Sequence, residues 1–141
     1  MNALATITDA QPSVAPGSAN SELSGAVLVV DDEPVLRESL RLFLRSHCEV
    51  ACAASVDEAV SLLEASEFSL VIMDINMPVK DGIQGLREMH PRWPELPILI
   101  LTGFADGDTV SEAMELGAKG VLKKPFDLME MLGTVRSYLG S

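Results

Sequence analysis

The chain has 141 residues, enough for one domain with its own core, and its 48% hydrophobic content with one Trp and one Tyr predicts that this core is aliphatic. The formal net charge of −11 repels nucleic acid phosphates and anionic membrane surfaces, which argues against DNA or lipid binding by this chain alone. No apolar run approaches membrane-spanning length and the first basic side chain is Arg37, so we expect a soluble cytoplasmic protein without an export signal.

The first 24 residues are rich in Ala, Ser, Thr and Pro and show neither helical nor strand periodicity. We therefore predict a disordered tail over residues 1–24 and a folded domain over residues 25–141. Within that domain, apolar strands alternate with amphipathic helices five times.

The first predicted strand, Ala26–Val30, runs directly into the pair Asp31-Asp32. A helix follows with Pro34 in its opening turn, and its apolar face consists of Leu36, Leu40, Phe43 and Leu44. The second predicted strand is Glu49–Ala53. After it, Ser55 and Glu58 form a capping box for a helix that directs inward Val56, Ala59, Val60 and Leu63.

The central strand, Phe68–Asp74, is an uninterrupted apolar run that ends on a lone carboxylate. Such a run is typical of a strand buried on both faces. Asp81 opens the next helix, which ends before Pro91, and its predicted inward residues are Ile83, Leu86 and Met89.

The fourth predicted strand, Ile98–Leu101, leads through Thr102 and Gly103 to a helix that ends at Gly117. Its predicted buried side consists of Val110, Ala113 and Met114. A short fifth strand, Gly120–Leu122, precedes Lys123-Lys124-Pro125. Asp127 and Glu130 cap the last helix, whose apolar period is formed by Leu128, Met131, Leu132, Val135 and Leu139.

Cys48 and Cys52 lie four residues apart around the second strand. Four extended residues span about 13 Å, which is too far for a disulfide between them. Two cysteines are too few for a zinc site, and His47 and His90 form no ligand motif with them. We expect buried free thiols, with a redox role as the alternative.

Five strand-helix units predict an α/β fold, a doubly wound five-stranded parallel sheet with helices on both faces. In the flavodoxin-like strand order 2-1-3-4-5, strands one and three are neighbours where the winding reverses, and ligands bind there at the carboxyl ends of the strands. Asp31, Asp32 and Asp74 would then converge at this edge of the sheet.

Three carboxylates gathered at one edge repel one another. At about 5 Å and an effective dielectric constant near 20, each pair costs about 3 kcal/mol, and Lys124 supplies only one compensating charge. A divalent cation resolves the conflict, and carboxylate and carbonyl oxygens favour Mg²⁺. The alternative for Asp31-Asp32 is a helix cap, and Thr102 and Lys124 taken singly are ordinary strand-end and loop residues. Their occurrence at one edge favours a site.

These groups suit phosphoryl transfer onto Asp74. A carboxylate can act as a nucleophile and form an aspartyl phosphate. Mg²⁺ and Lys124 would neutralise the phosphoryl oxygens, and the Thr102 hydroxyl would donate a hydrogen bond to one of them.

From about residue 25 to residue 139, the sequence resembles the CheY-like receiver domain of two-component response regulators. The matching stretches are Val29-Val30-Asp31-Asp32-Glu33, Met73-Asp74-Ile75-Asn76-Met77-Pro78-Val79-Lys80-Asp81-Gly82, Leu101-Thr102-Gly103 and Lys123-Lys124-Pro125-Phe126. The resemblance implies that Asp74 accepts a phosphoryl group from a phosphohistidine of a sensor histidine kinase or a histidine phosphotransfer protein.

The resemblance also implies a ligand set for Mg²⁺, namely Asp32, Asp74 and the backbone carbonyl of Asn76, with Asp31 acting through water. It identifies Lys124, rather than Lys123, as the lysine of the family, because Lys124 directly precedes Pro125. The family often has a cis peptide bond before this proline.

In the family, the threonine hydroxyl moves toward the phosphate and an aromatic residue of strand five turns inward, which changes the surface of helix four, strand five and helix five that a downstream effector protein contacts. Here Thr102 is present, but the aromatic position holds Val121, which has no ring to move. We hypothesise that Phe104 lies over the site, where it slows attack by water or takes over part of the switching. Unchanged dephosphorylation and partner affinity in Phe104→Ala would contradict this hypothesis.

The resemblance favours a phosphorylatable receiver that signals through protein contacts and is not an enzyme, although it takes part in its own phosphorylation and dephosphorylation. A phosphorelay shuttle or phosphate sink is the alternative within the family, and phosphoryl flow to a second histidine protein would distinguish it. A phosphatase of the haloacid dehalogenase type also uses an Asp after a strand with Mg²⁺, but that family expects a second acid where Asn76 stands. Turnover of a generic phosphomonoester would favour that class.

Overall fold

The computed structural model describes residues 22–103 and 107–140 and contains one five-stranded sheet in the order β2-β1-β3-β4-β5. All four strand pairs are parallel, as predicted. The strands are β1 (Ala26–Val30), β2 (Glu49–Ala53), β3 (Leu70–Asp74), β4 (Ile98–Thr102) and β5 (Gly120–Lys123). The helices are α1 (Pro34–Leu44), α2 (Val56–Ala65), α3 (Gly82–Met89), α4 (Gly107–Glu115) and α5 (Leu128–Tyr138).

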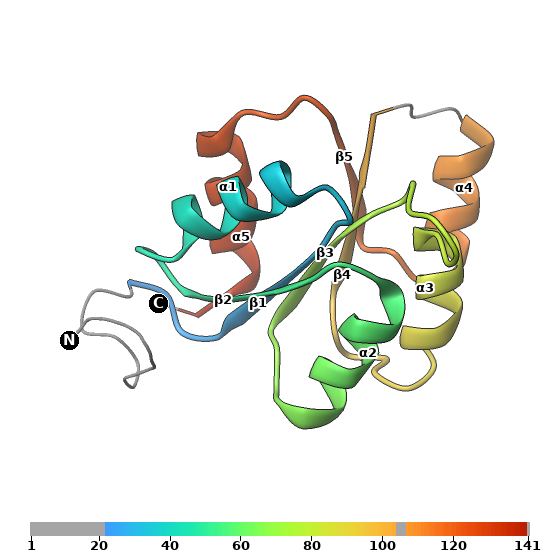
Figure 1. Cartoon of the computed structure of the whole chain (residues 1–141), viewed down its shortest axis with the longest axis horizontal. Helices are drawn as coiled ribbons and strands as arrows, with labels where there is room; N and C mark the ends of the chain where they lie inside the picture. Colours follow the sequence, from blue (N-terminus) through green and yellow to red (C-terminus); the bar gives the residue numbers. More distant parts are fainter. Residues whose placement is uncertain (1–21, 104–106, 141) are drawn as a thin grey trace.

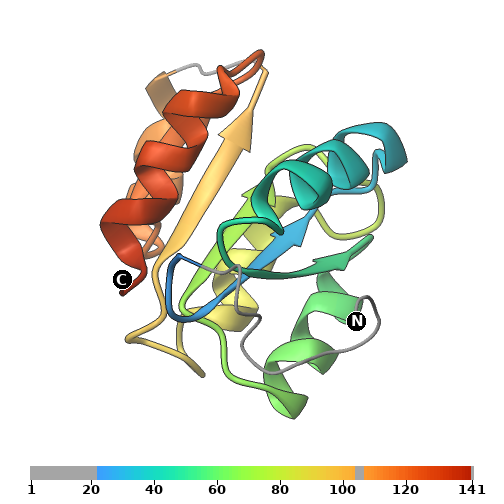
Figure 2. The same cartoon turned by 90° about the vertical axis from the view of Figure 1, so that its left-hand side faces the viewer.

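Helices cover both faces of the sheet, which confirms the doubly wound architecture. Helices α1 and α5 lie on one side, and α2, α3 and α4 lie on the other (Figure 1). Figure 2 views the molecule from the side of α1 and α5, with both helices in front of the strands. Alternate residues of β3 enter two separate apolar layers, Leu70 and Ile72 toward α1 and α5 and Val71 and Met73 toward the opposite helices. Within the described chain, β3 and β4 are buried along their whole length.

Three helices begin at the residues that the sequence predicts, because a side chain there accepts otherwise unpaired backbone N–H groups. Ser55 Oγ accepts from Glu58 N at 3.1 Å, and Asp81 Oδ1 accepts from Gln84 N at 2.9 Å. Asp127 Oδ1 accepts from both Met129 N and Glu130 N. In the predicted capping box, the Glu58 carboxylate accepts from Ala54 N, one residue before the cap.

Helix α4 ends in a Schellman motif at Gly117, as the glycine predicts. The Ala118 N–H donates to the Ala113 carbonyl at 3.0 Å and the Gly117 N–H to the Met114 carbonyl at 3.1 Å. Gly117 has a φ of +110°, and a Cβ there would lie 2.6 Å from the His90 ring. A side chain at this position is therefore excluded both by the backbone conformation and by the neighbouring ring.

Two predicted core residues are exposed instead. Met114 is exposed because neighbouring residues of a helix lie about 100° apart, and Ala113 is the one that faces the sheet. Leu128 shares its helical face with buried Met131, but it is the first residue of α5 and lies one turn before burial begins.

Residues 22–24, which composition assigns to the tail, pack on the folded domain. Leu23 is buried and its N–H donates to the His47 carbonyl at 2.9 Å. Ser24 pairs with Gly140 in an antiparallel bridge, and Glu22 forms an ion pair with Arg136 and lies 3.2 Å from His47 Nδ1. A single bridge and one buried residue have no periodicity, so the sequence pattern does not reveal them.

Both cysteines are free thiols, as predicted, but only Cys48 is buried and Cys52 is half-buried. Burial raises the pKa of each thiol to about 11. Within the described residues, no helix has the length and apolar character needed to cross a lipid bilayer.

Candidate functional site

The candidate site lies at the edge of the sheet where the parallel strands end (Figure 1). Strands β1 and β3 are hydrogen-bonded neighbours, with Val30 opposite Met73, so Asp31 and Asp74 follow at the same level. Asp32 completes the cluster, and one carboxylate oxygen of each of the three acids lies within 4.8 Å of the others. The structure therefore brings together the three acids that the sequence predicts to converge.

Asp31 is fully buried and held from several sides. Its Oδ1 accepts the Glu33 N–H at 2.8 Å, its Oδ2 lies 3.3 Å from Lys124 Nζ, and its own N–H donates to the Ala53 carbonyl at 3.0 Å. Its carbonyl accepts from Arg37 Nη1 at 2.7 Å. Sequence reasoning missed Arg37, whose only signal is an arginine one turn into the helix behind an acidic pair.

The alternative that the Asp31-Asp32 pair caps the first helix is wrong for α1. The N-cap residue is Glu33, its side chain makes no cap hydrogen bond, and Pro34 opens the helix without needing one. The carboxylate of Asp31 is directed to the site instead, where it contacts Lys124.

Asp74 is buried at the end of β3 with two polar contacts. Its Oδ1 accepts the Asn76 N–H at 3.2 Å and lies 3.4 Å from Lys124 Nζ. Burial raises the pKa of the Asp74 carboxyl above its usual value, and the charge of Asp31 raises it further, while the Asn76 N–H and Lys124 act in the opposite direction. A cation at this place would favour the ionised form.

Lys124, and not Lys123, reaches the acids. Its N–H donates to the Thr102 carbonyl at 2.8 Å, which fixes the start of the segment after β5 beside the end of β4. Its side chain is 21% exposed and its Nζ lies between Asp31 and Asp74. The peptide bond to Pro125 is cis, as expected.

The remaining predicted residues lie in three different settings. Thr102 is buried at the end of β4, at the edge where the acids gather, and Asn76 is exposed directly after Asp74 and Ile75. Val121 is half-buried on β5, opposite Ile100, and packs on the apolar layer under α2, α3 and α4. Phe104 lies outside the described residues, so its predicted position over the site stays a prediction.

The donor set fits a hard divalent cation. Every donor in the cluster is a carboxylate oxygen, and Mg²⁺ prefers oxygen ligands at about 2.1 Å while retaining several waters. Lys124 alone does not balance three acids. Among residues 22–103 and 107–140, this is the one group of three or more potential ligands.

Replacing Lys124 by Met is expected to destabilise the metal-free chain by about 2 kcal/mol, because two buried carboxylates lose their shared cation. The measurement is urea unfolding in the presence of a chelator. Lys123→Met is the matched control, since this exposed neighbour forms no ion pair with the acids and should leave stability within about 0.5 kcal/mol. Equal effects of the two substitutions would contradict the assignment.

Comparison with known proteins agrees with this geometry. Residues 27–136 match the family model described as the response regulator receiver domain. The response regulator protein FleR of Pseudomonas aeruginosa is 40% identical over 115 residues, which cover 80% of this chain and 24% of FleR. Protein CcdB of Bacillus subtilis is 36% identical over 116 residues, covering 81% of this chain and 97% of CcdB. The chain thus spans about a quarter of several curated relatives that it matches.

Solved structures show the same fold. The chemotaxis protein CheY4 of Vibrio cholerae superposes with a TM-score of 0.77 at 31% identity, covering 82% of this chain and 98% of CheY4. A CheY-like receiver domain protein of Methanospirillum hungatei superposes with a TM-score of 0.77 at 25% identity, covering 80% of this chain and 91% of that protein.

Proposed function

The chain belongs to the response regulator receiver domain family of two-component signal transduction, and from this premise we propose that it accepts a phosphoryl group on Asp74 and signals through protein contacts. The observation that carries the proposal is the setting of Asp74: a buried carboxylate at the end of a central strand, with Asp31 and Asp32 on one side and Lys124 Nζ at 3.4 Å. A buried carboxylate whose charge is not balanced destabilises the fold, but it is a suitable nucleophile for a phosphoryl group.

The proposed reaction is an in-line transfer from a phosphohistidine of a sensor histidine kinase or a histidine phosphotransfer protein. A carboxylate oxygen of Asp74 forms the new P–O bond as the P–N bond to the histidine breaks, and the leaving imidazole takes up a proton. Lys124 Nζ neutralises the phosphoryl oxygens, and the Thr102 hydroxyl donates a hydrogen bond to one of them.

Asp32, Asp74 and the Asn76 carbonyl would hold Mg²⁺, with Asp31 acting through water. When bound, this ion supplies positive charge for the acids and for the transferred group. The raised pKa of Asp74 supports the presence of a cation in the proposal. Burial disfavours the anionic form that the reaction needs, and a bound cation would stabilise that form. A divalent cation would act in the opposite direction to burial and lower this pKa.

We further propose that the output surface is formed by α4, β5 and α5. Strand β5 is at the edge of the sheet, with α4 and α5 on its two sides (Figure 1). Met114 of α4 and Leu128 and Met129 of α5 are large apolar side chains exposed on these helices, and such residues suit contact with a downstream effector protein. Val121 stands where the family has an aromatic side chain. Beside the predicted role of Phe104, we propose that the coupling runs through the backbone hydrogen bond from the Lys124 N–H to the Thr102 carbonyl, which joins the ends of β4 and β5.

The test is phosphorylation by acetyl phosphate, read by intact mass. We expect the mass of one phosphoryl group to be added in Mg²⁺ and not in a chelator, and peptide mapping to place it on Asp74. The chain should act as an acceptor that loses its phosphoryl group slowly, and should not turn over a phosphomonoester. Modification of another residue, or equal modification with and without Mg²⁺, would contradict the proposal.

A further inference from the structure

The loop between β3 and α3, residues 75–81, carries the proposed carbonyl ligand of Asn76 and is fastened at its base by Gly82, the first residue of α3. The Gly82 N–H donates to the Ile75 carbonyl at 2.9 Å, and the Ile75 N–H donates to the Leu101 carbonyl at 2.9 Å. Met77 is buried in the apolar layer. The part that projects from this base is the exposed limb, residues 78–81.

The exposed limb contains a strained turn. The Lys80 N–H donates to the Pro78 carbonyl at 2.8 Å, and the residue between them, Val79, has a φ of +67°. This is a classic γ-turn, a rare and strained conformation, and a β-branched residue is poorly suited to positive φ. The Val79 side chain is fully exposed, so its own packing does not hold the turn in place. Surrounding contacts must do so.

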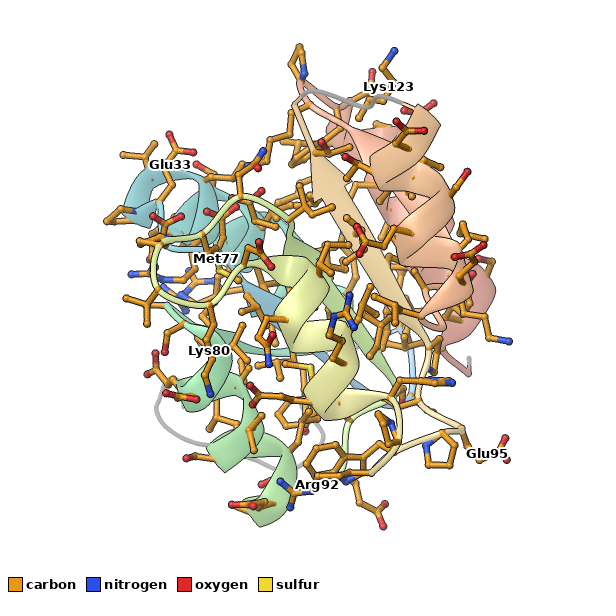
Figure 3. The ribbon with its side chains drawn as sticks, turned by 90° about the vertical axis from the view of Figure 1, so that its right-hand side faces the viewer. Glu33, Met77, Lys80, Arg92, Glu95 and Lys123 are labelled. Atoms are coloured by element: carbon orange, nitrogen blue, oxygen red, sulfur yellow. The ribbon has the colours of Figure 1, made fainter. Side chains whose placement is uncertain are left out.

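Lys80 provides such contacts. Its Nζ lies 2.7 Å from Asp57 Oδ1 at the start of α2 and 2.9 Å from Glu88 Oε2 on α3. The Glu88 carboxylate also accepts from Gln84 Nε2 at 3.1 Å, which fixes the position of one anchor. Figure 3 shows Lys80 between the loop that carries Met77 and helix α2. One side chain thus ties the exposed limb to two helices.

We propose that Lys80 is a positioning residue: by pairing with Asp57 and Glu88 it holds the strained turn at Val79 and thereby fixes the Asn76 carbonyl relative to Asp74 for metal binding. This inference rests on the proposed function. Lys80 pairs with acids of α2 and α3 and not with the acids of the site, so it acts on the site only through the backbone of the loop. Loss of the Lys80 side chain would let the turn relax, and the Asn76 carbonyl would then occupy a wider range of positions relative to Asp74.

The test compares Lys80→Met with Arg92→Met. Arg92 pairs with Glu64 at 2.7 Å, near the end of α2. Both substitutions therefore remove a surface cation that bridges to the same helix, but only Lys80 belongs to the loop (Figure 3). By calorimetric Mg²⁺ titration, Lys80→Met should bind about threefold to tenfold more weakly, as expected for the loss of two exposed ion pairs. Arg92→Met should stay within about twofold of the unaltered chain.

The sign of the change separates positioning from simple electrostatics. Removing a positive charge near three acids would by itself strengthen Mg²⁺ binding, so unchanged or tighter binding by Lys80→Met overturns the inference. A second readout needs no metal: amide hydrogen exchange at Lys80 and Gly82, whose N–H groups hold the loop, should accelerate in Lys80→Met and not in Arg92→Met. Equal exchange in the two variants would also overturn it.

The inference and the proposed function can fail separately. If the unaltered chain is phosphorylated on Asp74 in Mg²⁺ while Lys80→Met binds Mg²⁺ as the unaltered chain does, only the role of Lys80 is wrong. If the unaltered chain binds no Mg²⁺, both are wrong. The double variant Asp57→Asn, Glu88→Gln removes the same two contacts from the opposite side, so it should reproduce the faster amide hydrogen exchange of Lys80→Met at Lys80 and Gly82 in the absence of metal.

Discussion

Asp74→Asn is expected to abolish phosphorylation by acetyl phosphate and, at the same time, to make the metal-free chain more stable. The amide keeps the shape of the side chain but is not an anionic nucleophile, so the loss should exceed about a thousandfold, with no phosphoryl group detectable by intact mass. It also removes one of three mutually repelling charges, which the ion-free fold tolerates poorly.

The gain in stability should depend on pH. The pKa of the Asp74 carboxyl in the folded chain is raised above 3.8, first by burial and further by Asp31, so the folded chain binds this proton more tightly than the unfolded chain does. The ionised carboxylate therefore lowers stability progressively as pH rises from about 3.8 through the folded pKa. Metal-free Asp74→Asn should melt several degrees higher at pH 7. That advantage should disappear at acidic pH, below both pKa values.

Thermal melts across the pH range, in chelator and in Mg²⁺, measure this effect. Mg²⁺ should raise the melting temperature of the unaltered chain and do so much less in Asp74→Asn. Glu95→Gln is a suitable control, because this exposed acid lies at the opposite end of the molecule from Lys123 and the acidic edge (Figure 3). An Asp74→Asn chain that melts lower than the unaltered chain in chelator at neutral pH would show that the carboxylate is held by favourable contacts.

Gly82→Ala is expected to have the largest structural effect, because the loop that carries the site closes on this glycine. A Cβ at Gly82 would lie 2.7 Å from the Ile75 Cα and 2.8 Å from the Asp74 carbonyl oxygen, and both contacts are with backbone. The backbone can move apart only by breaking the hydrogen bond from the Gly82 N–H to the Ile75 carbonyl. We expect a loss of about 3 kcal/mol by urea unfolding, together with weaker Mg²⁺ binding.

Gly133→Ala is the matched control for that substitution. Gly133 lies on α5, and a Cβ there would meet nothing within 4 Å. Alanine in an exposed helix position is favoured over glycine by about 1 kcal/mol, so this variant should be slightly more stable than the unaltered chain. Opposite signs for two Gly→Ala changes would show that the effect at Gly82 comes from the close approach of the loop. A small loss of unfolding free energy in Gly82→Ala would mean that the loop opens readily to admit the Cβ.

Much of the fold and the site could be predicted because both depend on pattern rather than on fine contact. Apolar runs that stop at polar residues mark the strands, and parallel strands end at the same edge of the sheet. The sequence alone therefore predicts that Asp31 and Asp74 lie close together, as the pairing of β1 with β3 confirms. Capping side chains such as Ser55 and Asp127 are equally local signals, since they act on N–H groups two or three residues away.

The residues that sequence reasoning missed act across long separations or through backbone shape. The two anchors of Lys80 come from different helices, and one of them, Asp57, precedes it by 23 residues. The positive φ of Val79 has no signal in the sequence, because a valine usually indicates extended structure. The composition of the sequence places Leu23 in the tail, because one buried residue next to a two-residue bridge has no period to detect.

The antiparallel bridge between Ser24 and Gly140 brings both described ends of the domain to one corner. This corner adjoins the beginning of β1, whereas the carboxylates lie beyond its end, about 16 Å away along five extended residues. A fluorophore or surface tether attached at this corner should therefore leave phosphoryl chemistry undisturbed. A short peptide joining residue 140 to residue 22 should also allow the chain to be reopened elsewhere as a circular permutant.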